Sequence, residues 1–185
     1  MRQPLIAALV LLVAPAVMAA HYRGTTLSRD GSKLVLHTDH GDVLAPRTAA
    51  GQEGFEDPRV SPDGRMVGWL VPIHVSGISF PTPVTLVLFR DGKVVRHFDV
   101  GLAIIYAWSF VSGGRTVAYA MSTAYSPTGF DYELRRVSDG HLLGKFSCRR
   151  TLAGTPPKAT LSGNWSHRGK VPAWVWPIAQ DCPTR

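Results

Sequence analysis

Residues 60–69 read Val60-Ser61-Pro62-Asp63-Gly64-Arg65-Met66-Val67-Gly68-Trp69, and this stretch decides the fold. An apolar residue ends one strand, a polar pair leads into Asp63-Gly64, and a second strand alternates apolar positions up to a large ring. The glycine supplies the positive φ that a tight hairpin needs. The stretch therefore predicts two antiparallel strands joined by a short turn.

The same ten-residue pattern occurs three more times, over Leu27–Leu36, Phe110–Tyr119 and Trp165–Trp174. The aligned glycines are Gly31, Gly64, Gly114 and Gly169, which lie 33, 50 and 55 residues apart. These spacings are close to those of propeller blades, which hold four strands in roughly 40–50 residues.

Two complete four-stranded units are predicted in the middle of the chain. Strands are expected near 58–61, 66–74, 84–89 and 93–100, and then near 106–111, 116–122, 132–137 and 141–146. Both units run in the order short glycine turn, long loop, short glycine turn. The sequence therefore predicts an all-β fold, a propeller-like array of about three to four antiparallel blades that forms either an open arc or a small four-bladed ring.

Ser61-Pro62-Asp63-Gly64-Arg65 with Trp69, echoed from Trp165 to Trp174, resembles the repeat of TolB-type bacterial β-propellers. Similar repeats occur in the non-catalytic propellers of prolyl-oligopeptidase-like peptidases. The resemblance covers about residues 26–176 and implies a blade fold with a protein-binding role in the bacterial envelope, without fixing particular binding residues. A full TolB-type ring has six blades, and this chain has fewer. An open arc would leave free sheet edges, so a homodimer is one expectation.

The N-terminus has the order of a secretory signal peptide. Arg2 is followed by the apolar run Leu5–Val13, by Pro15 and by small residues up to Ala20. We expect a signal helix over residues 1–20, a β-propeller-like domain over 21–185, and a periplasmic or secreted bacterial protein. The apolar run is shorter than the roughly 20 residues of a spanning helix, so no membrane span is expected in the mature chain.

The charge and the cysteines fit an exported protein. The formal charge is +7, but the basic residues are scattered rather than gathered in a stripe, so nucleic-acid binding is not expected. The two cysteines, Cys148 and Cys182, are predicted to form a disulfide in an oxidising compartment, the alternative being two free thiols.

Two long loops, Pro72–Pro83 and Ser122–Phe130, are expected to project from the same face of the blades. The candidate partner-binding residues in them are Ile73, Val75, Ile78, Phe80 and Tyr125. Apolar and aromatic groups on loops above a rigid scaffold are typical of a protein-binding surface. The alternative is that the loops fold inward and cover the blade edge.

The densest polar segment is His37-Thr38-Asp39-His40-Gly41-Asp42, expected on the same face as the long loops. On a strand, His37 and Asp39 would share one side, and His40 and Asp42 the other. Zinc needs three or four converging ligands, and the segment reads equally well as a polar hairpin turn, so no metal or cofactor is predicted.

The sequence contains neither a G-x-S-x-G nor an H-E-x-x-H motif. We therefore predict an exported, non-enzymatic binding module that holds a protein or envelope component through the long-loop face. Two alternatives stay open. One is an exported hydrolase-like enzyme with a polar site at residues 37–42, and the other is a structural assembly subunit.

Overall fold

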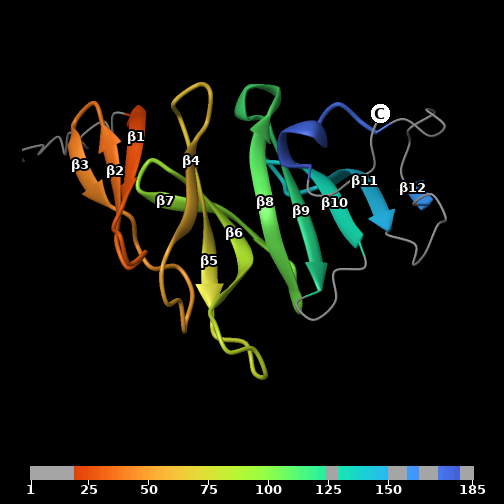
Figure 1. The fold of residues 1–185 in the computed structure, drawn as a ribbon. Coiled ribbons are helices and arrows are strands. Elements are labelled where there is room, and N and C mark those ends of the chain that lie inside the picture. Colours follow the sequence, from red (N-terminus) through yellow and green to blue (C-terminus); the bar gives the residue numbers. More distant parts are fainter. Residues whose placement is uncertain (1–18, 124–128, 150–157, 163–170, 180–185) are drawn as a thin grey trace, which may run out of the picture.

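The structure is a computed structural model that describes residues 19–123, 129–149, 158–162 and 171–179. It is all-β, with three antiparallel sheets that stand side by side (Figure 1). The first sheet contains β1 (Tyr22–Leu27), β2 (Leu34–Thr38) and β3 (Gly41–Leu44). The second contains β4 (Glu56–Val60), β5 (Val67–Ile73), β6 (Thr82–Arg90) and β7 (Lys93–Asp99). The third contains β8 (Ala103–Val111), β9 (Thr116–Thr123), β10 (Gly129–Arg136), β11 (Leu142–Arg149) and β12 (Lys158–Ser162).

The predicted all-β class is confirmed, and both predicted sets of four strands form, although β12 adds an unpredicted fifth strand to the second set. In both β4–β7 and β8–β11 each strand pairs with the next along the chain, as the expected series of hairpins requires. The predicted signal helix, residues 1–18 of it, lies outside the described residues. None of the helices in the described ranges has the length and apolarity to cross a membrane.

The fourth copy of the repeat does not form its predicted second strand. Residues 163–170 lie outside the described part, and Val171–Trp174 leads through a turn into the short 3-10 helix η2 (Trp176–Ile178). Pro172 and Pro177 supply no backbone N–H, which disfavours a paired strand here. Trp174, Val175 and Ile178 instead pack on the outer face of the third sheet, against side chains that include Ala120, Tyr132 and Phe146.

The second sheet is buried on both faces because it lies between the other two. One face packs on the third sheet through Leu70, Leu86, Leu88, Phe98, Ile105, Trp108 and Tyr119. The opposite face packs on the first sheet through Tyr22, Leu34, Leu36, Val67, Trp69, Val87 and Phe89. Six consecutive residues of β5 are therefore buried, as in strands covered on both sides.

The Ser-x-Asp-Gly turn has the same hydrogen bonds in the first two copies. The Ser61 hydroxyl donates to Asp63 Oδ1 at 2.6 Å and accepts the Met66 N–H at 2.9 Å. In the first copy the Ser28 hydroxyl donates to Asp30 at 2.7 Å and accepts the Lys33 N–H at 2.9 Å. The repeated motif thus encodes one local turn geometry.

The first two copies lie at opposite ends of the sheets. The Tyr22 N–H donates to the Gly64 carbonyl, whereas Gly31, at the other end of β1, is hydrogen-bonded to Phe55. The β4–β5 turn is therefore beside the start of β1, and the β1–β2 turn is at the far end (Figure 1). Gly31 and Gly64, which are 33 residues apart, therefore do not occupy equivalent positions in successive sheets.

We predict that Gly68→Ala destabilises the fold by about 1–3 kcal/mol, because overpacking a filled core forces neighbours to shift. A Cβ on Gly68 would lie 2.5 Å from the Trp108 ring and 2.9 Å from Leu88. Gly24→Ala is the matched control, since its Cβ would meet only His37 at 3.9 Å. Urea unfolding measures both, and equal effects of the two substitutions would contradict the packing argument.

We also predict an unusually acidic Asp30. The Ser28 hydroxyl, followed by the N–H and hydroxyl of Ser32, lowers the pKa of Asp30 to about 2. Because the folded-state pKa lies below the unfolded value of about 3.9, the associated stabilisation is present above that pH and is lost as the pH falls towards 2. Side-chain NMR titration should show this midpoint, and Ser28→Ala should raise it. Ser76→Ala should leave it unchanged, because Ser76 is exposed and is not among the groups that lower the pKa of Asp30.

Candidate functional site

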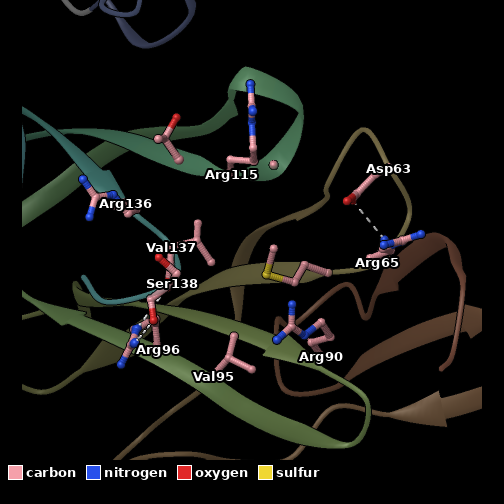
Figure 2. Close-up of a pocket in the computed structure, with 12 residues that line it drawn as sticks. Asp63, Arg65, Arg90, Val95, Arg96, Arg115, Arg136, Val137 and Ser138 are labelled. Carbon is pink, nitrogen blue, oxygen red and sulfur yellow. Dashed lines mark hydrogen bonds between the residues drawn. The ribbon is translucent and has the colours of Figure 1, made fainter. Parts of the chain in front are cut away.

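A cavity of about 750 Å³ opens between the second and third sheets, at the end that carries their short turns. Arginines from both sheets surround it (Figure 2). Arg65 follows the β4–β5 turn, Arg90 ends β6, and Arg96 comes from β7. On the side of the third sheet, Arg115 precedes β9 and Arg136 ends β10. Four of the five arginines thus lie at strand ends, where short turns hold them.

The lining of the cavity is strongly basic over an apolar floor. Met66, Val95 and Val137 supply the apolar surface, and Asp63 is the one carboxylate beside five arginines among the described lining residues. Burial alone would raise the pKa of Asp63, but the Ser61 hydroxyl and the Arg65 N–H hold it below its usual value. Asp63 therefore stays ionised and offsets only part of the positive charge.

Two of the arginines are positioned by backbone carbonyls rather than by carboxylates. Arg96 donates from Nε to the Val137 carbonyl at 3.0 Å and from a terminal nitrogen to the Ser138 carbonyl. Arg115 donates from Nε to the Ser112 carbonyl at 3.1 Å. A carbonyl acceptor fixes a guanidinium group without cancelling its charge, so both groups remain fully cationic.

The other three arginines differ in their neighbours. Arg136 pairs with Asp139 at 2.8 Å, and Arg90 lies 3.9 Å from Asp91. Within the described ranges, Arg65 has no carboxylate oxygen within 4 Å of its guanidinium nitrogens. Arg65 and the carbonyl-bound Arg115 are therefore the groups most available to an incoming anion.

This arrangement is suited to binding phosphate, sulfate or carboxylate groups, because guanidinium groups match two oxygens at once. The described lining contains Thr116 and Ser138 hydroxyls but no histidine, glutamate or cysteine that could exchange protons near neutral pH. The five guanidinium groups dominate the chemistry of this lining.

The predicted partner-binding residues differ in their exposure. Some are exposed, as a binding surface requires, and others are buried, as expected if the loops cover the blade edge. Ile78 is buried, and Val75 and Ile73, the last residue of β5, are partly buried, so these three side chains face the protein although the loop itself projects from the sheet. Phe80 is 58 % exposed and lies at the rim of a second cavity. Tyr125 lies outside the described residues.

The predicted polar segment forms the β2–β3 hairpin. Asp39 and His40 are its turn, and His37 contacts Asp42 across the hairpin instead of sharing a side with Asp39 (Nδ1 to Oδ1, 2.7 Å). The Thr26 hydroxyl lies 2.7 Å from His37 Nε2, and His40 Nε2 lies 3.6 Å from Asp39. The expectation that this segment shares the long-loop face is wrong, because Asp39 is hydrogen-bonded to His21, whose ring packs on Gly64 at the short-turn end.

Thr26, His37 and Asp42 form a row of hydroxyl, imidazole and carboxylate, the order that nucleophilic catalysis uses. The row lies across a sheet face, and its members do not line either of the two cavities described here. Among the described residues, no group of three or more histidine, cysteine, aspartate or glutamate side chains is placed to hold a metal ion.

No protein-family model matches the chain, and a search of curated proteins found no significant match. The resemblance to TolB-type repeats therefore rests on the sequence motifs. Cys148 is buried in β11, and Cys182 lies outside the described residues, so their disulfide stays a prediction.

The five arginines were not among the site residues predicted from the sequence. Arg65 and Arg115 each follow the glycine of a repeat copy, and Arg90 and Arg136 each end a strand that enters a short Asp-Gly turn. Because the short turns of both units were expected on one face, this shared position was a usable signal for a basic cluster.

We predict that Arg96→Met lowers the free energy of unfolding by about 1.5–3 kcal/mol, because two carbonyls lose a charged donor. Arg65→Met should change it by less than about 0.5 kcal/mol, as expected for an exposed side chain without a hydrogen-bonding role. Urea unfolding of both variants measures the difference. Equal destabilisation would show that Arg96 does not connect the two sheets.

Proposed function

We propose that this chain is an exported, non-enzymatic binding module whose arginine-lined pocket holds an anionic group of a protein or envelope component. The observation that carries the proposal is the convergence of five arginines from two sheets on one cavity, with a single carboxylate among its described lining residues. Charges of one sign in a cleft focus the field and raise the local concentration of the opposite ion.

The scaffold in this proposal is propeller-like and related to the TolB-type repeat. The second and third sheets would be two blades, and the first sheet a shorter one. The support is that β4–β7 and β8–β11 share strand order and alternate short turns with a longer middle loop. Face-to-face packing of successive sheets is also the way blades pack.

The proposed compartment is the bacterial periplasm or the exterior of the cell. It rests on the signal-like N-terminus and on the two cysteines, which would pair there. Phosphate- and carboxylate-bearing molecules of an envelope would be the natural ligands of a guanidinium-lined pocket.

Titration calorimetry with inorganic pyrophosphate, citrate and phosphatidylglycerol vesicles tests the proposal. We predict saturable binding of at least one probe, weakened by salt because exposed charges are screened. The double variant Arg65→Gln with Arg115→Gln should bind at least about tenfold more weakly, which corresponds to about 1.4 kcal/mol.

The double variant Arg23→Gln with Arg29→Gln is the control, because both residues are exposed and lie outside the pocket while the change in net charge is the same. If both double variants weaken binding equally, the attraction comes from net charge and not from the pocket. Failure of all three probes to saturate would reject an anion site.

A further inference from the structure

The interface between the second and third sheets opens again at its opposite end. A cavity of about 580 Å³ lies there, bordered by the bulged part of β4, by the start of β6 and by the first half of β8. The long β5–β6 loop projects from this end (Figure 1). The cavity shares no lining residue with the arginine pocket.

The edge of β8 faces this groove. Four consecutive residues, Ile104 to Ala107, line it, and they span a bulge, because the register of β8 against β9 shifts between Ile105 and Ala107. β8 is the last strand in the pairing order of the third sheet, and β4 is the corresponding edge of the second. Edge strands carry backbone groups that can pair with an added strand, so the groove can accept an extended peptide.

Two exposed aromatic side chains flank the edge. Phe80 is 58 % exposed and Tyr106 is 40 % exposed, and the Tyr106 ring is held edge-on against Phe130 with 5.3 Å between the centroids. Pro81 and Pro83 stiffen the segment on the other side of the groove. Rigid aromatic surface beside a pairing edge favours a peptide with an aromatic or large apolar side chain.

A carboxylate gives the groove a charge preference. Glu56 has no ion-pair partner among the described residues, whereas its neighbour Asp57 is held by Arg59 through two contacts of 3.0 Å. The Glu56 residue is exposed, but partial desolvation of its carboxyl group and then the nearby Asp57 charge raise its pKa, so a cationic ligand group would relieve an unfavourable environment.

The backbone next to this carboxylate departs from regular strand geometry. Asp57 has a φ of 42°, which is rare for a residue other than glycine, and its carbonyl accepts the Trp108 indole N–H at 2.9 Å. The register of β4 against β5 shifts between Glu56 and Arg59, which marks a bulge. Bulges commonly re-aim side chains next to binding sites.

We infer that this groove binds an extended peptide segment carrying a basic side chain next to an aromatic one, which adds as a strand to the edge of β8 that pairs with no other strand in the described part of the chain. The basic group lies against Glu56, and the aromatic group lies against Phe80 and Tyr106. This peptide binding does not depend on anion binding in the arginine pocket. The double variant Arg65→Gln with Arg115→Gln should therefore bind the peptide as the unchanged protein does.

The test uses the full chain and the blocked hexapeptide Ser-Phe-Lys-Phe-Lys-Ser with an N-terminal fluorophore, followed by anisotropy. We expect saturable binding that Phe80→Ala and Glu56→Gln each weaken by about five- to tenfold, the scale of one lost charged or aromatic contact. Leu44→Ala and Glu53→Gln are matched controls, because both residues are exposed and lie outside the groove. They should change the affinity by less than about twofold.

Two altered peptides test the chemistry. The peptide with glutamates in place of lysines should bind at least about tenfold more weakly, and methylation of alternate backbone amides on the pairing side should abolish binding. Equal binding of the lysine and glutamate peptides would overturn the charge assignment. Full binding by every amide-methylated peptide would overturn strand addition, and the absence of saturable binding by the lysine peptide would overturn the inference as a whole.

Discussion

The contact between Gly68 and the Trp108 ring determines how the second and third sheets meet. Only glycine at position 68 leaves room for the ring, and the next residue, Trp69, points to the opposite face, where it packs against Phe55 and Phe89. Successive side chains of β5 therefore point to opposite faces and pack in both interfaces of the central sheet. On the side of the third sheet, the indole N–H of Trp108 donates to Asp57, and Arg59 lies 5.7 Å from the ring centroid. The arginine pocket and the groove at Phe80 lie on either side of this filled centre, at the two ends of the interface.

The two ends of this interface are chemically opposite for a topological reason. In both β4–β7 and β8–β11 the short turns meet at one end, and the longer connections meet at the other. Short turns bring strand ends together, so arginines placed beside them converge, as Arg65 and Arg115 do. The long-loop end instead receives side chains from a bulge and a loop, including Glu56 and Phe80. One packing contact in the middle thus separates a cationic pocket from an acidic, aromatic groove.

Local signals in the sequence predict the strands well but their placement less well. Asp63-Gly64 and Asp30-Gly31 form the expected hairpins with matching serine and aspartate bonds, because those bonds involve only residues within five positions. Which end of a sheet a turn occupies depends on the preceding strands, and the first copy lies at the opposite end from the second. The polar segment at 37–42 looked like a site because its groups are adjacent, but cross-strand pairing of His37 with Asp42 uses them within the hairpin. The arginine cluster was missed because the convergence of Arg65, Arg90 and Arg96 with Arg115 and Arg136 depends on how the second and third sheets pack.

The hydrogen bonds that hold the arginines in place favour anion binding in the pocket. A free arginine side chain loses about 2 kcal/mol of rotamer entropy when it is fixed, and a ligand that must order it bears that cost. Arg96 and Arg115 are already hydrogen-bonded to backbone carbonyls, so part of this cost is met by folding. Had carboxylates held them, as Asp139 holds Arg136, their charges would be offset before any ligand arrived. Anchoring by carbonyls therefore orders the two guanidinium groups without offsetting their charge. The Ser112 carbonyl belongs to the turn of a repeated glycine motif, and the Val137 carbonyl belongs to the turn that contains Asp139-Gly140.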